Sequence, residues 1–152
     1  MNIHNEKITQ QPAIANREGL RQELEGTRNT FQRHLDALDE KQWRQKSSTS
    51  DWTAGEIMTH LTWALEQLPK EVASAKRGEG MFNSGPSWLA DPLSYWYTRL
   101  LARNATPESL GRRYDAAMDA VIRSLDEVKD REWTLGAPFY GHGFYSIADL
   151  FH

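Results

Sequence analysis

The stretch WTAGEIMTHL, residues 52–61, decides the fold class. Thr53 and Glu56 form a capping-box pattern, in which the hydroxyl accepts from the Glu56 amide and the carboxylate reaches back to the Thr53 amide. Apolar residues then recur at steps of three and four, which places them on one stripe of a helix; they are Ile57, Leu61, Ala64, Leu65, Leu68 and Val72. This pattern predicts a long amphipathic helix, stapled by Trp52 onto Ile57 and kinked or shifted at Pro69.

Other stretches show the same helical period. Residues 20–38 carry one apolar stripe, and residues 88–103 form an aromatic-rich segment in which Tyr95, Trp96 and Tyr97 cannot all face one side. Thr106 and Pro107 are a helix cap and a first-turn proline, and they open a third stripe. Its members are Leu110, Tyr114, Ala117, Met118, Val121, Leu125 and Val128.

The end of the chain begins another helix. Ser146 and Asp149 form a second capping pattern, and the apolar stripe that follows contains only Ile147, Leu150 and Phe151. Residues 41–52 and 131–145 are expected to be loops, and no segment alternates as a strand would. The sequence therefore predicts an all-α fold, a four-helix bundle with the last helix truncated. Residues 1–16 are expected to be a flexible leader and residues 17–152 the bundle domain.

Composition narrows the class of protein. The 152 residues suffice for one domain with its own core. The absence of cysteine excludes disulfides and thiolate nucleophiles, and no apolar run approaches the roughly 20 residues that span a bilayer. A net charge of -3 gives no basic surface for nucleic acid. We therefore expect a cytoplasmic protein that binds neither membrane nor nucleic acid.

His60 is the main candidate for chemistry. Because Ile57 precedes it by three residues and Ala64 follows by four, we expect the imidazole to face inward, towards the first and last helices. One interpretation is a structural histidine hydrogen-bonded in the core. The other is a metal ligand, since bundles build metal sites from inward side chains and neutral imidazole is a common ligand of divalent metals.

The remaining histidines are weaker candidates. His4 lies in the leader, and His34 is expected to be a structural residue at the edge of the first helix. His142, between two glycines, either forms a tight turn or lies at a pocket mouth, and His152 lies near the start of the last helix. No His-x-x-x-His pair is present. The 16 aromatic residues, six of them Trp, fill a core or line a pocket; the pocket interpretation names Trp63, Trp88, Trp96 and Tyr145.

The order and spacing of two stretches, residues 52–61 and 133–151, resemble the DinB/YfiT-like superfamily over residues 17–152. The resemblance implies a four-helix bundle, often dimeric, with Zn or Ni held by three histidines. In that comparison His60 matches the ligand on the second helix. The histidine pair of the last helix has no match, although His152 lies near it. Relatives include enzymes that use a low-molecular-weight thiol, such as mycothiol-dependent maleylpyruvate isomerase.

Two functions remain open at this point. The first is a divalent-metal-dependent enzyme, a thiol-dependent transferase or isomerase or a hydrolase, acting on a small molecule and forming a homodimer; no catalytic residue is assigned. The second is a non-catalytic helical module that binds a ligand or a protein through Met81, Phe82 and the aromatic third helix. Two measurements would separate them: the metal content of the purified chain, and the effect of Phe82→Asp on its size-exclusion behaviour.

Overall fold

The computed structural model describes residues 16–48, 50–80, 87–138 and 143–152, with the backbone alone for residues 87–93. The helices are α1 (Arg17–Ala37), α2 (Glu40–Arg44), α3 (Ala54–Arg77), α4 (Ser87–Ala102), α5 (Pro107–Asp126) and α6 (Ile147–Leu150). A 3-10 turn, η1 (Asp130–Glu132), and two strands, β1 (Gly136–Pro138) and β2 (Phe144–Ser146), separate α5 from α6. The prediction of an all-α fold is confirmed. All of the predicted leader except Asn16, which caps α1, lies outside the described residues.

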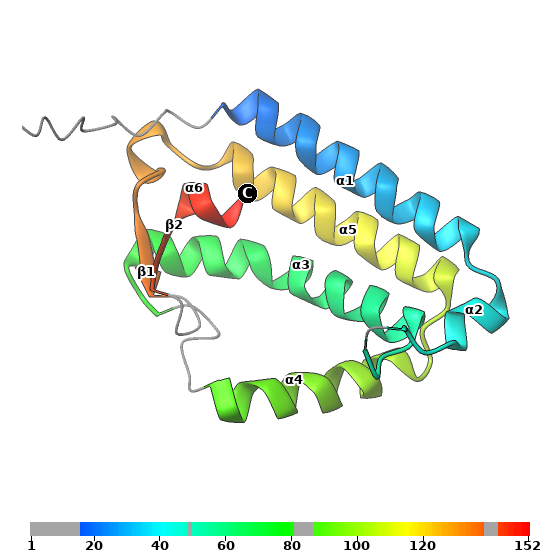
Figure 1. Cartoon of the computed structure of the whole chain (residues 1–152). Helices are drawn as coiled ribbons and strands as arrows, with labels where there is room; N and C mark the ends of the chain where they lie inside the picture. Colours follow the sequence, from blue (N-terminus) through cyan, green and yellow to red (C-terminus); the bar gives the residue numbers. More distant parts are fainter. Residues whose placement is uncertain (1–15, 49, 81–86, 139–142) are drawn as a thin grey trace, which may run out of the picture.

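Helix α5 is the centre of the molecule. It packs against α1 on one side and α3 on the other, while α4 packs on α3 (Figure 1). The apolar stripe predicted for α5 is confirmed, since Met118, Val121 and Leu125 are fully buried. On the α1 side, the ring of Tyr114 stacks on Phe31 with centroids 3.6 Å apart. Because α5 is covered on two sides, its buried surface is wider than the predicted stripe and also includes Gly111 and Ile122.

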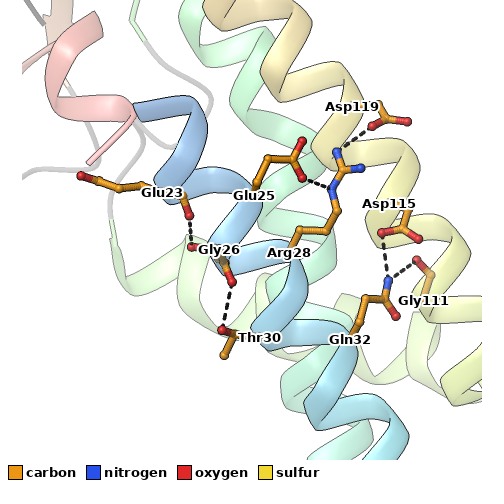
Figure 2. A network of polar contacts seen from close by, with 10 residues as sticks. Glu23, Glu25, Gly26, Arg28, Thr30, Gln32, Gly111, Asp115 and Asp119 are labelled. Atoms are coloured by element: carbon orange, nitrogen blue, oxygen red, sulfur yellow. Dashed lines mark hydrogen bonds and ion pairs between the residues drawn. The ribbon is translucent and has the colours of Figure 1, made fainter. Parts of the chain in front are cut away.

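Polar side chains fix how α1 lies along α5 (Figure 2). Arg28 lies between Glu25 of its own helix, at 3.4 Å, and Asp119 of α5, at 2.6 Å. One turn further along, the Gln32 amide donates to the Gly111 carbonyl at 3.1 Å and to Asp115 at 2.9 Å. Because these bonds lie at the edge of the apolar contact, they set the register of the two helices more than their stability.

The predicted helix starts are confirmed. Thr53, Thr106 and Ser146 each accept a hydrogen bond from the third amide of the helix that follows. Pro69 does not end α3, which continues through it to Arg77. The predicted loop over residues 41–52 is partly wrong, because it contains most of α2. That helix starts with a capping box between Asp39 and Gln42, which is too short a signal to stand out in the sequence.

The predicted loop over residues 131–145 is also partly wrong. Strands β1 and β2 pair antiparallel there, with Ala137 opposite Tyr145. Each strand has three residues, so no alternation could show in the sequence. Gly136 allows the close approach, because a Cβ there would lie 2.0 Å from the Tyr145 carbonyl oxygen. The hairpin leads directly into α6, whose Ile147 is fully buried in the core.

An apolar groove runs between α1 and α3 above α5. Its volume is 450 Å³, and Leu61 on its wall is 49% exposed. The lining residues are Thr27, Thr30, Phe31 and His34 of α1, Met58, Leu61, Ala64, Leu65 and Leu68 of α3, and Tyr114 of α5. Part of the apolar stripe predicted for residues 57–72 therefore faces this groove rather than the closed core.

Gly55 is required by the packing of Trp43 against the start of α3. A Cβ at Gly55 would lie 2.6 Å from Trp43 Cε2, and the indole is itself buried. We expect Gly55→Ala to lower the free energy of unfolding by about 1–3 kcal/mol in urea denaturation. Gly26→Ala on α1, where a Cβ meets no atom within 4 Å, should instead raise it by roughly 0.5–1 kcal/mol. A shift of the same sign in both variants would contradict this account.

The closed core and the groove predict different costs for the same truncation. Leu125→Ala removes a fully buried side chain and should lower the free energy of unfolding by about 2–5 kcal/mol. Leu61→Ala in the groove should cost less than about 1 kcal/mol, because half of that side chain is already in water. Chemical denaturation of the two variants measures both. Equal costs would mean that the groove is closed in solution.

Candidate functional site

His60 lies between α3 and α4, not on the side of α3 that faces α1. Its Nδ1 lies 3.2 Å from the hydroxyl oxygen of Thr98 on α4, and Thr98 is 1% exposed. The expectation that His60 faces the first and last helices is therefore wrong. Helical spacing alone could not show which neighbouring helix His60 faces, because α3 is covered by α5 on one side and by α4 on another.

Aromatic rings surround the His60 imidazole. The Trp52 ring meets it edge-on at 5.0 Å between centroids, and the Trp63 ring is tilted at 5.9 Å. Tyr95 of α4 packs on the far side of Trp52 at 5.8 Å. Trp52 thus contacts His60 and α4, where the sequence suggested a staple onto Ile57. The result is a half-buried imidazole in an aromatic seam between two helices.

The seam favours the neutral form of His60. Burial lowers the pKa of His60 below its ordinary value of 6.5, because the rings replace water that would solvate an imidazolium. With Nδ1 directed at Thr98, the described residues offer no partner to Nε2. A neutral imidazole with one nitrogen anchored and the other available can accept a proton, accept a hydrogen bond or bind a metal.

Of the other predicted site residues that the structure describes, Trp63 contacts His60, whereas Tyr145, Trp96 and His152 lie elsewhere. Trp63 and Tyr145 line a separate 260 Å³ cavity with Gln67, Glu71 and Asp149. Trp96 is 68% exposed on α4 and contacts Tyr95, so the expectation that the three consecutive aromatics face different sides is confirmed. His152 follows α6 and is exposed. His142, Met81, Phe82 and the side chain of Trp88 lie outside the described residues.

Within the described part of the chain, no three His, Asp or Glu side chains are placed to share a metal ion. The His60 imidazole could bind a metal. His152, the other predicted ligand, is exposed after the end of α6, whereas His60 lies on α3. Glu56, one turn before His60 on α3, is not bonded to the imidazole. It bonds instead to the Thr53 amide at 2.8 Å and pairs with Arg99 at 3.2 Å. The described residues therefore do not form a three-ligand site.

Sequence reasoning missed two residues that position His60. Thr98 anchors the ring, and Trp52 walls it. The spacing of Tyr95 and Thr98, three residues apart on α4, is the available signal, because it puts both on one helical face. A lone threonine in an aromatic helix gives no reason to choose it until α4 is packed on α3.

The sequence of the chain matches a known protein family. The model of the DinB superfamily matches residues 23–152. The chain belongs to the DinB superfamily. No curated protein and no solved structure matches it.

Among the described residues of this DinB-superfamily chain, no helix is long and apolar enough to cross a membrane. The homodimer, the cytoplasmic location, the thiol and the small-molecule ligand stay predictions.

His60 should make the stability of the fold depend on pH. Its pKa is lowered in the folded state, so the unfolded chain binds a proton more readily, and the free energy of unfolding falls as the pH drops below the unfolded value. We expect the wild type to lose stability between about pH 7.5 and 5.5, and His60→Asn, whose amide takes the position of Nδ1 and does not titrate, to lose less. Urea denaturation across this range measures both slopes; identical slopes would show that His60 is freely solvated.

Proposed function

We propose that the protein is a divalent-metal-dependent enzyme of the DinB superfamily, a transferase, isomerase or hydrolase acting on a small molecule, in which His60 supplies one metal ligand. The observation that carries the proposal is the state of His60: neutral, half-buried and anchored through Nδ1 to Thr98. Ligand histidines are commonly held in this way, with the second ring nitrogen bonded to a protein oxygen that fixes the tautomer. Family membership supports the fold of this proposal and leaves the reaction open.

The work of each residue follows from the geometry. Thr98 would accept from Nδ1–H, which leaves the Nε2 lone pair free to bind a cation. Trp52 and Trp63 keep water from the ring, so that protons compete less for Nε2 near neutral pH. A bound divalent metal would supply Lewis acidity. Since the described residues offer His60 alone, no reaction step is assigned.

The test is calorimetric titration of the chain with Zn²⁺ and with Ni²⁺. We expect weak binding, because zinc sites usually use three or four protein ligands and the described residues supply one. His60→Ala should abolish it. Thr98→Val, which leaves the imidazole in place and removes its anchor, should weaken it without changing the helical content seen by circular dichroism.

The matched control is His34→Ala, which removes an exposed histidine of α1. It should leave the affinity unchanged. If His60→Ala binds either metal as tightly as the wild type, or if His34→Ala weakens binding equally, His60 is a structural histidine and the enzyme proposal fails.

A second function, a non-catalytic binding module, is favoured by the outer surface of α4. Trp96, Tyr97 and Leu100 are 68%, 47% and 61% exposed on this one helix. Exposed large apolar residues that gather on one element are typical of binding surfaces. A metal titration without response would leave this as the better description.

A further inference from the structure

A larger cavity lies where the seam between α3 and α4 meets the ends of α2 and α5. Its volume is 610 Å³, within the range of small-molecule pockets, and neither His60 nor any other histidine lines it. The ends of four helices form its walls: α2, the first turn of α3, the last turn of α4 and the first turn of α5. The floor includes the buried indole of Trp43.

The charged groups around this cavity are three arginines and two glutamates, which leaves a local balance of +1 in a chain of net charge -3. Arg44 pairs with Glu40 at 3.3 Å, and Arg99 pairs with Glu56 at 3.2 Å. Arg103 is exposed and has no charged partner among the described residues. The positive charge that remains unbalanced is therefore that of Arg103, which lines the cavity.

Arg99 is held in place from three sides. Its guanidinium lies 4.4 Å from the centroid of the Tyr95 ring, its Nε lies 3.2 Å from a Glu56 oxygen, and its Nη2 donates to the Asp51 carbonyl at 3.4 Å. The last of these bonds is long and therefore weak. A guanidinium fixed in orientation, with N–H groups left for a ligand, is suited to binding a carboxylate through two parallel hydrogen bonds.

The rest of the lining is apolar. Ala102, Ala105 and Pro107 join Trp43 on the walls. Small ligand sites combine such walls with a few charged groups that orient the ligand. A local charge of +1 matches a ligand with a single negative charge. The second charge of a doubly charged ligand would be unbalanced and would be repelled by the two glutamates nearby.

We propose that this cavity binds a small organic carboxylate, whose carboxylate meets Arg99 and Arg103 and whose apolar body lies on Trp43. The site is independent of the proposed metal chemistry at His60, since its binding needs neither the imidazole nor a metal. It lies one helical turn from His60 along α3, on the same seam.

The test is calorimetric titration of the metal-free chain with benzoate as the probe. Arg103→Gln should weaken benzoate binding about tenfold, as expected for loss of a charge-assisted hydrogen bond. Arg99→Lys keeps the charge and removes the fork, and should weaken it by a similar factor. Binding to the wild type should also weaken as salt is raised. Benzyl alcohol, which keeps the ring and lacks the charge, should bind at least about tenfold more weakly than benzoate.

The matched control is Arg123→Gln, because Arg123 is exposed near the other end of α5, away from the cavity, and has no charged partner among the described residues. It should bind benzoate like the wild type. The proposal is overturned if Arg103→Gln leaves the affinity unchanged, if Arg123→Gln weakens it equally, or if benzyl alcohol binds as tightly as benzoate. His60→Ala should bind benzoate normally, so failure here and failure of the metal titration are separate results.

Discussion

The packing of α5 between α1 and α3 is the interaction on which the rest of the structure depends. Its buried residues join two apolar clusters, one around Val121 and Leu125 and one around Tyr114 and Met118. With α5 covered on two sides, α3 still has a free face, and α4 occupies it. The seam that holds His60 exists because α3 is shared between these two neighbours. On the α5 side, the Arg113 guanidinium makes two bonds to Glu66, at 2.6 and 2.8 Å, which hold the helices in register.

The seam between α3 and α4 changes character along its length. At the His60 level it is aromatic and partly shielded from water, which favours a neutral imidazole. One turn towards the start of α3 it opens into a cavity whose charges are arginine and glutamate. Two adjacent residues of α4 mark the change: Thr98 contacts His60, and Arg99 lines the cavity. A single helix pair therefore presents two chemically different environments, a half-buried imidazole and a group of arginines.

The C-terminal hairpin has a structural role of its own. By pairing β1 with β2, it carries the chain back across the end of the bundle and delivers α6 to the core. Trp133 meets Phe151 edge-on at 6.2 Å, and the Trp133 carbonyl accepts from the Ala148 amide. These contacts hold α6 against α3 at one end of the bundle (Figure 1), while the groove lined by Leu61 stays open.

The sequence by itself determined the long helices α1, α3, α4 and α5, but not the short α2. Capping residues such as Thr53 and Thr106 and the apolar period of α5 act within a few residues, so they can be read without knowing the neighbours of a helix. It also singled out His60 as a candidate for chemistry, and the imidazole is half-buried in the structure. Only the tertiary structure decided which neighbour His60 faces, because periodicity defines a stripe on α3 but not which helix covers it. The arginine cavity was likewise hidden, since Arg44 ends α2 while Arg99 and Arg103 lie at the end of α4, and these arginines meet only when the two helix ends converge.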